Sequence, residues 1–422
     1  MKKDWLLFID ILLIVAVGLT TLYSTVIGTE GVFAGGGILN KQLIFVLVGF
    51  GLYFSLSYFD YRFLGYRQVI LPMYAVSLLL LIFVLVFGCE INNAKRWIVI
   101  GDFQLQPSEI AKLAMLMTTA WLFSMRTKIN VWILAGVSFI LTLVMTLLVF
   151  REPDAGTSII LFAVWGLTVF SVIPNQGRNS VVLSIGGLGA LLVNLLLGSA
   201  IQESLVIGML LVAATLLGAA LIKNTRILLV AALLGGLTLG FVGRVSWNYA
   251  WENVLSETQR DRVEDFINPT RDVTGSGFQV DQSKVAIGSG MLLGKGFGHG
   301  TQSKLNFLPE HQTDFIFASF AEEFGFVGVV FVLSLYGLTI IRIFSASAAV
   351  SDSFGSLLCL GLGIKLMLEV FINIGMNLGL IPATGVPLPL MSSGGTIFLI
   401  TMISFGLVQS VRIHQENVGL VE

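Results

Sequence analysis

An acidic residue on a flexible, charge-dense segment is the first place in this chain where chemistry could occur. Asp272 lies between Arg271 and a Gly-Ser-Gly sequence, within residues 244–310, which hold fifteen of the charged residues (24 basic and 25 acidic in all). A carboxylate on such a loop could act as a general base, although the segment holds eight acids. Arg260 and Arg262 could bind a diphosphate through bidentate contacts, or pair with neighbouring carboxylates on a solvated helix.

Two pairs of opposite charges lie inside apolar segments. Glu109 and Lys112 are three residues apart and follow Pro107 and Ser108, which favour a helix start and place the pair on one helix face. They form either a structural ion pair or part of a polar cavity, in which Lys112 meets a substrate phosphate. Lys365 and Glu369, four residues apart, favour mutual neutralisation inside a membrane helix.

Other candidate motifs carry weaker signals. Trp97 follows two basic residues and is either an interfacial anchor or a platform for stacking against a sugar. The glycine-rich run at residues 288–300 matches no phosphate-binding pattern and favours a tightly turning loop on the membrane surface. The two cysteines and three histidines form no metal-ligand pattern.

These residues must be positioned by membrane helices. The chain is 55% hydrophobic and 12% charged, with a mean hydropathy of +0.90, and apolar runs of about 20 residues recur along it. This pattern predicts an all-α polytopic membrane protein, and the net charge of −1 gives no reason to expect a nucleic-acid partner. Twelve spans are predicted: 5–27, 42–58, 68–88, 108–124, 131–150, 158–173, 180–199, 203–222, 227–246, 313–341, 354–378 and 391–411.

The distribution of basic residues predicts the orientation. Short loops on the side of the N-terminus hold eleven basic residues, whereas the opposite short loops hold four. Because short cytoplasmic loops are enriched in Lys and Arg, both termini are predicted to be cytoplasmic and the loop at 244–312 to face outward. There is no phosphate-binding loop for ATP, so the chemistry predicted for the outer face requires a substrate that is already activated.

Taken together, the motifs resemble one family, the SEDS proteins (shape, elongation, division and sporulation) of the RodA/FtsW type, and RodA is favoured. The matching motifs are Trp97 with residues 106–112, Glu152 to Thr157, Gln259 to Arg262, Asp272 to Gln279, Gln282 to Gly290, Phe307 to Glu310, Thr313 to Phe317, and Gly385 to Pro389 with Ser392 to Gly395. The departures are Glu152 for a usual Gln, Val273 for Pro, Gln312 for His and Ser393 for Tyr.

The resemblance implies a fold and a reaction. The expected fold is a SEDS-type helical bundle of about 10–12 transmembrane helices, one domain over residues 1–422, with a catalytic loop at 244–312 and two extra spans near 180–222. The reaction implied is the polymerisation of lipid II into β-1,4 glycan strands, with inversion, at the outer face of the bacterial cytoplasmic membrane. Asp272 would be the general base, and the substrate-binding residues would be Trp97, Glu109, Lys112, Arg260, Arg262, Gln279, Ser283, Lys284, Thr313, Asp314 and Ser392.

The resemblance also implies partners. Lipid II and a class B penicillin-binding protein, the crosslinking transpeptidase, would be the partners, together with membrane lipid. No protein metal ligands are predicted, and the charge of the leaving diphosphate could be compensated by Arg260, Arg262, Lys112 or a divalent cation (Mg2+ or Mn2+). The alternative functions are a lipid II flippase or other transporter, and a non-catalytic scaffold for the transpeptidase.

Overall fold

The computed structural model describes residues 3–26, 36–91, 94–101, 103–174, 251, 255–267, 276–304 and 310–415. The chain divides into two compact units, one formed by Met1–Thr168 with Asp261–Glu422 and the other by Val169–Arg260. Most described residues belong to the first unit. The predicted spans at 180–199, 203–222 and 227–246 lie outside the described residues, as does Asp272.

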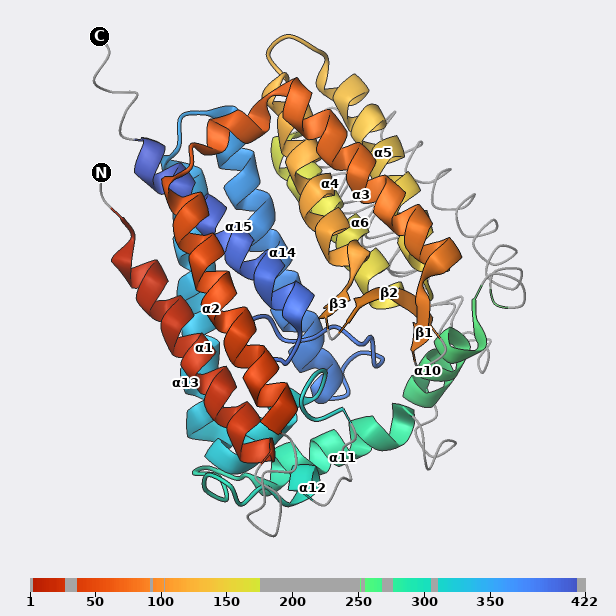
Figure 1. Ribbon diagram of the computed structural model, residues 1–422, viewed down its shortest axis with the longest axis vertical. Helices are drawn as coiled ribbons and strands as arrows, with labels where there is room; N and C mark the ends of the chain where they lie inside the picture. Colours follow the sequence, from red (N-terminus) through yellow and green to blue (C-terminus); the bar gives the residue numbers. More distant parts are fainter. Residues whose placement is uncertain are drawn as a thin grey trace, which may run out of the picture. The chain divides into compact units, whose positions relative to one another are not determined.

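Helices make up most of the described chain (Figure 1). Eight of them are long and apolar enough to cross a membrane, which confirms the polytopic all-α class. Their bounds are α1 Trp5–Val26, α2 Gly36–Tyr58, α3 Arg67–Phe87, α5 Val131–Arg151, α6 Ala155–Val172, α13 Ile316–Ala349, α14 Ser353–Asn377 and α15 Gly395–His414. The remaining helices are η1 Tyr61–Gly65, α4 Pro107–Ser124, α10 Glu257–Ile267, α11 Ser276–Ser289 and α12 Thr301–Lys304.

Local sequence explains several helix starts. α4 begins at Pro107 with Glu109 in its first turn, as predicted. The carboxylate of Asp352 caps α14 by accepting a bond from the amide of Gly355, and the side chain of Asn130 caps α5 in the same way. The predicted tenth span starts later than expected, at Ile316, because residues 310–315 form a turn that leads into α13.

A small antiparallel sheet, which a purely helical prediction did not include, joins α3 to α4. Its strands are β1 Cys89–Ile91, β2 Ala94–Ile100 and β3 Phe103–Leu105, in the order β1-β2-β3. Trp97 faces Cys89 across the first pair of strands, and Ile98 faces Leu105 across the second. The sheet folds the chain back over one end of the helices and delivers Gln106 to the start of α4.

α14 and α15 form the centre of the first unit (Figure 1). In their most apolar windows, 67% and 83% of residues are buried, against 17% for α2 and 22% for α3. Close approach is made possible by glycines: a Cβ on Gly406 of α15 would lie 3.0 Å from the carbonyl oxygen of Tyr53 in α2, and one on Gly361 of α14 would lie 2.8 Å from Leu116 of α4.

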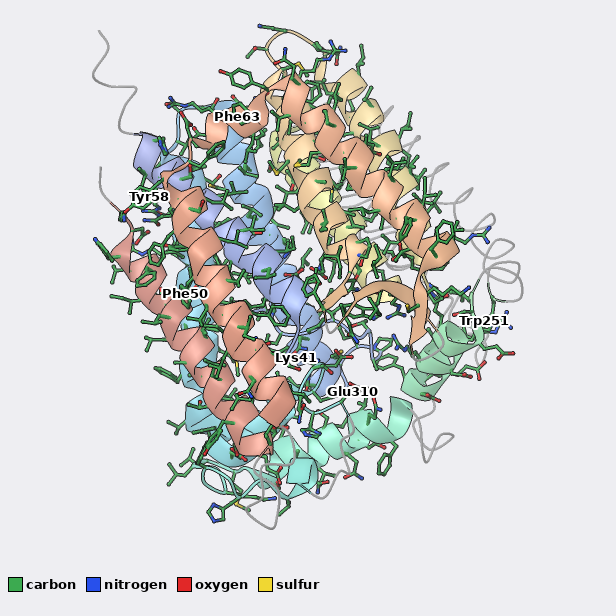
Figure 2. The ribbon with its side chains drawn as sticks, in the orientation of Figure 1. Lys41, Phe50, Tyr58, Phe63, Trp251 and Glu310 are labelled. Atoms are coloured by element: carbon green, nitrogen blue, oxygen red, sulfur yellow. The ribbon has the colours of Figure 1, made fainter. Side chains whose placement is uncertain are left out.

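The beginning of α1 and the end of α15 lie at the same face of the unit. Asp4, just before α1, forms ion pairs with Arg412 at 3.1 Å and with Arg342 at 3.9 Å. Tyr58 and Phe63 lie toward this end, whereas Lys41 and Glu310 lie toward the other, where the sheet, α11 and α12 gather (Figures 1 and 2).

α13 is interrupted near its start, and a loop repairs the break. Gly325 has φ 64° and ψ −167°, which is not helical. In a continuous helix the amides of Phe326 and Val327 would bond to the carbonyls of Glu322 and Glu323. Instead these amides donate to the carbonyls of Met291 and Leu292 at 2.9 and 3.1 Å.

The freed carbonyls are satisfied by the same loop. The amide of Lys295 donates to the carbonyl of Glu322, and the amide of Gly296 donates to that of Glu323, both at 3.0 Å. Glycine is required at the crossing, since a Cβ on Gly294 would lie 2.1 Å from the carbonyl oxygen of Glu323. We call residues 291–296 the splice loop, because its backbone is inserted into the hydrogen-bond ladder of α13.

Candidate active site

A cluster of charged side chains occupies the end of the first unit that carries the sheet. Arg96 on β2 donates from Nε to the carbonyl of Glu152 at 3.1 Å and from Nη2 to the carbonyl of Pro153. Asp154 caps α6 by accepting from the amide of Thr157, and its other oxygen accepts from Nε2 of Gln106, both at 3.1 Å. The sheet and the start of α6 are thereby tied together.

Arg262 and Asp314 complete this cluster. Both lie against the backbone of Gly385, which has φ +73°: a Cβ built there would be 3.5 Å from Oδ2 of Asp314 and 3.7 Å from Nη1 of Arg262. Asp314 precedes α13 and Arg262 lies on α10, so a turn and a helix distant in sequence meet here. We call Arg96, Asp154, Arg262 and Asp314 the polar cluster.

The electrostatics of the polar cluster are set by burial and by like charges. Burial, followed by the charge of Glu310, raises the pKa of Asp314 to about 6, although Arg262 and Arg96 oppose the rise. Burial and the nearby charge of Arg96 lower the pKa of Arg262. A guanidinium still remains charged at any physiological pH.

This arrangement suits an anionic ligand. Two guanidinium groups lie close enough for the charge of one to lower the pKa of the other, and each could donate bidentate hydrogen bonds to a diphosphate. The carboxyl of Asp314, with a pKa of about 6, would exchange a proton near neutral pH. Together these groups can hold a charged leaving group and accept or donate protons beside it.

A hydrogen-bond web fixes the turn that carries Thr313 and Asp314. Nδ2 of Asn373 donates to the carbonyls of Asp314 and Val386 at 2.9 and 2.7 Å, and Nδ2 of Asn377 also donates to Asp314, at 3.1 Å. Ser392 donates to the carbonyl of Thr313 at 2.6 Å. The backbone of the turn is therefore held by α14 and by the loop before α15.

The same web includes two positions where the chain departs from the family pattern. The amide and the hydroxyl of Ser393 both donate to the carbonyl of Gln312, each at 2.9 Å. Ser283 of α11 donates to the carbonyl of Asn377 at 2.8 Å, which ties α11 to the end of α14. The hydroxyl groups of Ser283 and Ser392 thus serve as protein contacts in this structure.

The two predicted charge pairs form a single buried network. Lys112 contacts Glu109 at 2.8 Å and Glu369 at 2.6 Å, and Lys365 contacts Glu369 at 2.9 Å. All four side chains are almost fully buried, and the network joins α4 to α14. Both pairings predicted from spacing are therefore present, and the ammonium of Lys112 is already shared by two carboxylates. A role of Lys112 at a substrate phosphate remains a prediction.

The other predicted site residues are placed as follows. Trp97 and Gln279 are partly buried, on β2 and α11. Lys284 is exposed on α11 and pairs with Asp281 at 3.2 Å. Arg260 lies in the second unit, where Nε donates to the carbonyl of Leu255 at 3.1 Å. Among the described residues, His, Cys, Asp and Glu form no group of three or more that could hold a metal ion.

Reasoning from sequence missed several residues that shape the site. Arg96 and Asp154 were not singled out for chemistry, although each lies in or beside a quoted motif. Asn373 and Asn377 could have been found from the sequence, because two amide side chains four residues apart inside an apolar span indicate a hydrogen-bonding face toward the protein interior.

Glu152 has an acid group that the described residues leave without a partner. The side chain is fully buried, and among the described residues neither of its carboxyl oxygens finds a hydrogen bond. Burial, together with the charge of Asp154, raises its pKa from 4.5 to about 9. The folded protein therefore holds Glu152 as a neutral acid at pH 7, which resembles the amide that the family usually has here.

We expect Glu152→Gln to change how stability depends on pH. Because the pKa is higher in the folded than in the unfolded chain, the parental protein should lose stability as pH rises from about 4.5 to 9, by up to about 1.4 kcal/mol per pH unit. Thermal unfolding in detergent at pH 6 and pH 8.5 measures this, and the variant should show the smaller decrease. Equal decreases in parent, Glu152→Gln and an exposed control, Asp281→Asn, would contradict a neutral buried acid.

Comparisons with known proteins cover nearly the whole chain. The family model FTSW_RODA_SPOVE, described as "Cell cycle protein", matches residues 4–208 and 188–417. Peptidoglycan glycosyltransferase MrdB of Escherichia coli is 36% identical over 82% of this chain and 78% of its own length. Peptidoglycan glycosyltransferase RodA of Treponema pallidum is 31% identical over 98% of both chains.

A solved structure resembles the fold as well. It is described as "Structural coordination of polymerization and crosslinking by a peptidoglycan synthase complex", and one of its chains aligns with a TM-score of 0.67 and 28% identity, covering 98% of this chain and 99% of the other. The family match, the two relatives and the shared fold agree with the motifs quoted above. The chain belongs to the FtsW/RodA/SpoVE family.

Proposed function

We propose that this chain is a peptidoglycan glycosyltransferase that polymerises lipid II into β-1,4 glycan strands for cell elongation. The observation that carries the proposal is the polar cluster, in which two guanidinium groups and two carboxyl groups gather at one end of an apolar bundle. The names of the relatives MrdB and RodA support the activity. We propose that the whole chain is one integral membrane domain, with the loop at 244–312 as its catalytic part.

The proposed reaction is an inverting displacement. The 4-hydroxyl oxygen of the acceptor sugar attacks the anomeric carbon of the donor, and the bond from that carbon to the diphosphate oxygen breaks. The diphosphate leaves with the electron pair, and the hydroxyl proton passes to the carboxylate of Asp272. A positioned base is needed because an alcohol must lose its proton as it attacks.

The leaving group would be stabilised by charges already present. Arg96 and Arg262 carry fixed positive charge where the diphosphate would depart, and a preorganised site does not have to reorient water. With the termini cytoplasmic, as the basic residues of the short loops predict, the cluster would face outward. The bilayer would be the bacterial cytoplasmic membrane.

The proposed partner is a class B penicillin-binding protein. The resemblance to a chain of a synthase complex that coordinates polymerization with crosslinking supports this assignment. The single span of the partner would pack against spans that include α13 and α14. Phe331 and Ile341 of α13 are exposed and would be available to such a helix.

A transporter remains the competing function, because the four buried charges lie within the bundle. However, two acids and two bases neutralise one another there, and each is engaged in an ion pair. A substrate pathway would require at least one of these pairs to open. The geometry therefore favours a structural role for the network and a catalytic role for the polar cluster.

The test is polymerisation of lipid II by the purified protein in liposomes, alone and with its cognate transpeptidase. Glycan strands should form, and they should be longer or more abundant with the partner present. A parallel assay follows movement of fluorescent lipid II between leaflets. Movement of lipid II with no strands, with the partner and divalent cations supplied, would replace the proposed function with transport.

A further inference from the structure

The tip of the splice loop exposes three consecutive apolar side chains. Met291, Leu292 and Leu293 are 82%, 61% and 75% exposed, although backbone bonds hold Met291 and Leu292 to α13. Isolated exposed apolar residues are common, but a run of three large ones on a fixed loop is costly in water. This tip requires an apolar neighbour that the chain itself does not provide among its described residues.

Two backbone carbonyls of the tip have protein partners in place of water. A loop in hydrocarbon is tolerated where protein groups satisfy its polar backbone. The carbonyls of Met291 and Leu292 accept from the amides of Phe326 and Val327, and the amide of Gly294 donates to the carbonyl of Gly290 at 2.8 Å. The bonds that repair the kink in α13 therefore also lower the cost of moving these two carbonyls out of water.

The tip is continuous with a lipid-facing surface. Phe326 and Val327, whose amides hold the tip, are themselves 61% and 54% exposed and belong to a helix apolar enough to span a membrane. The exposed apolar side chains of the tip thus adjoin those of α13 at the kink. The residues that pair through their backbones, Met291 with Phe326 and Leu292 with Val327, all have apolar side chains.

A polar boundary lies directly behind the tip. Nζ of Lys295 pairs with Glu322 at 2.5 Å, and the same carboxylate accepts from the amide and hydroxyl of Thr301 at 2.9 and 2.8 Å. Glu322 is fully buried, so this anchor is fixed from inside the protein. Apolar side chains on one side and an anchored ion pair on the other are typical of a segment at a membrane surface.

We propose that Met291, Leu292 and Leu293 insert among the acyl chains of the leaflet next to the first turns of α13. The distribution of basic residues predicts that this is the outer leaflet. The occupant is lipid hydrocarbon, because the tip is continuous with a membrane span and the carbonyls of Met291 and Leu292 are satisfied by that span. The insertion fixes the C-terminal end of α11 at the depth of the membrane surface.

The test measures depth directly and does not depend on enzyme activity. The chain has two cysteines, of which Cys359 is fully buried and Cys89 is exposed, so Cys89→Ser gives a background with no reactive thiol. A nitroxide label is attached to Leu293→Cys in this background, and the full chain is reconstituted in vesicles of phosphatidylethanolamine and phosphatidylglycerol. Collisions with oxygen, which concentrates in hydrocarbon, are compared with collisions with a water-soluble nickel complex.

Two labelled references bracket the result. Val330→Cys lies on the exposed face of α13 within the span, and Asp281→Cys lies on the exposed face of α11. The ratio of oxygen to nickel collisions at position 293 should be close to that at 330 and well above that at 281. A Met291→Cys label should agree, which guards against a local effect of one substitution.

Two results would overturn the proposal. A ratio at 293 equal to that at 281 would place the tip in water. Few collisions with either reagent at 291 and 293 would mean that protein, and not lipid, covers the tip. The collision ratios can be measured even if a labelled variant no longer polymerises lipid II, because the spectroscopic measurement needs only the folded chain.

Discussion

Replacing Asp272 with alanine is expected to slow lipid II polymerisation by about 10²–10⁴-fold, which is the usual contribution of a positioned general base. The acceptor hydroxyl would keep its proton during attack, and the transition state would carry an unfavourable positive charge on that oxygen. Asp272→Asn should be similarly slow, because an amide has the same shape but does not accept the proton. The rate of strand formation in liposomes, with the transpeptidase present, measures the effect.

The control for this experiment is another acid from the same charge-dense segment, residues 244–310. Asp281 is exposed and pairs only at the surface with Lys284, so Asp281→Ala should polymerise at nearly the parental rate. Lipid II binding should survive in Asp272→Ala, since the loss concerns proton transfer. Strand formation by Asp272→Ala at the parental rate would remove Asp272 from the proposed mechanism.

Removal of Glu369 is expected to have the largest effect on stability. Its two oxygens accept separately from Lys112 and Lys365, so Glu369→Ala leaves two buried ammonium groups to share one remaining acid, Glu109. Breaking a buried ion pair by removing one partner typically costs about 3–5 kcal/mol. The midpoint of unfolding in detergent should fall accordingly, and α4 and α14 should separate first.

A second substitution tests the cause of this loss. Glu369→Ala combined with Lys365→Met leaves Glu109 and Lys112 as a neutral pair, so the double variant should recover part of the lost stability. The matched control is the exposed pair, where Asp281→Ala should cost well under 1 kcal/mol. If the single variant at Glu369 is as stable as this surface control, the network contributes nothing to holding α4 against α14.

Local features of the site were predictable, because helical spacing determines which side chains can meet within one helix. The start of α4 at Pro107 and the pairing of Glu109 with Lys112 followed from residue type and spacing. The bond between Lys112 and Glu369 could not be predicted in this way, because it joins helices that are far apart in the sequence.

Contacts between segments that the fold brings back together also could not be predicted from residue spacing. Arg96 reaches the carbonyl of Glu152 only because the small sheet folds back over the helices. Similarly, Gly325 is one of many glycines in an apolar run, and its break in α13 becomes evident only when the partner loop is in place. The prediction of a tightly turning glycine loop was a local inference, whereas its insertion into a distant helix is tertiary.

The splice loop has a mechanical consequence. Four backbone hydrogen bonds join residues 291–296 to the two sides of the kink in α13, so the splice loop and that helix are expected to move together. α11 ends two residues before the splice loop begins, and Asp272 lies only four positions before the first residue of α11. We therefore expect a tilt of α13 at the kink, whether from lateral membrane tension or from a neighbouring helix, to displace the C-terminal end of α11 through these four bonds.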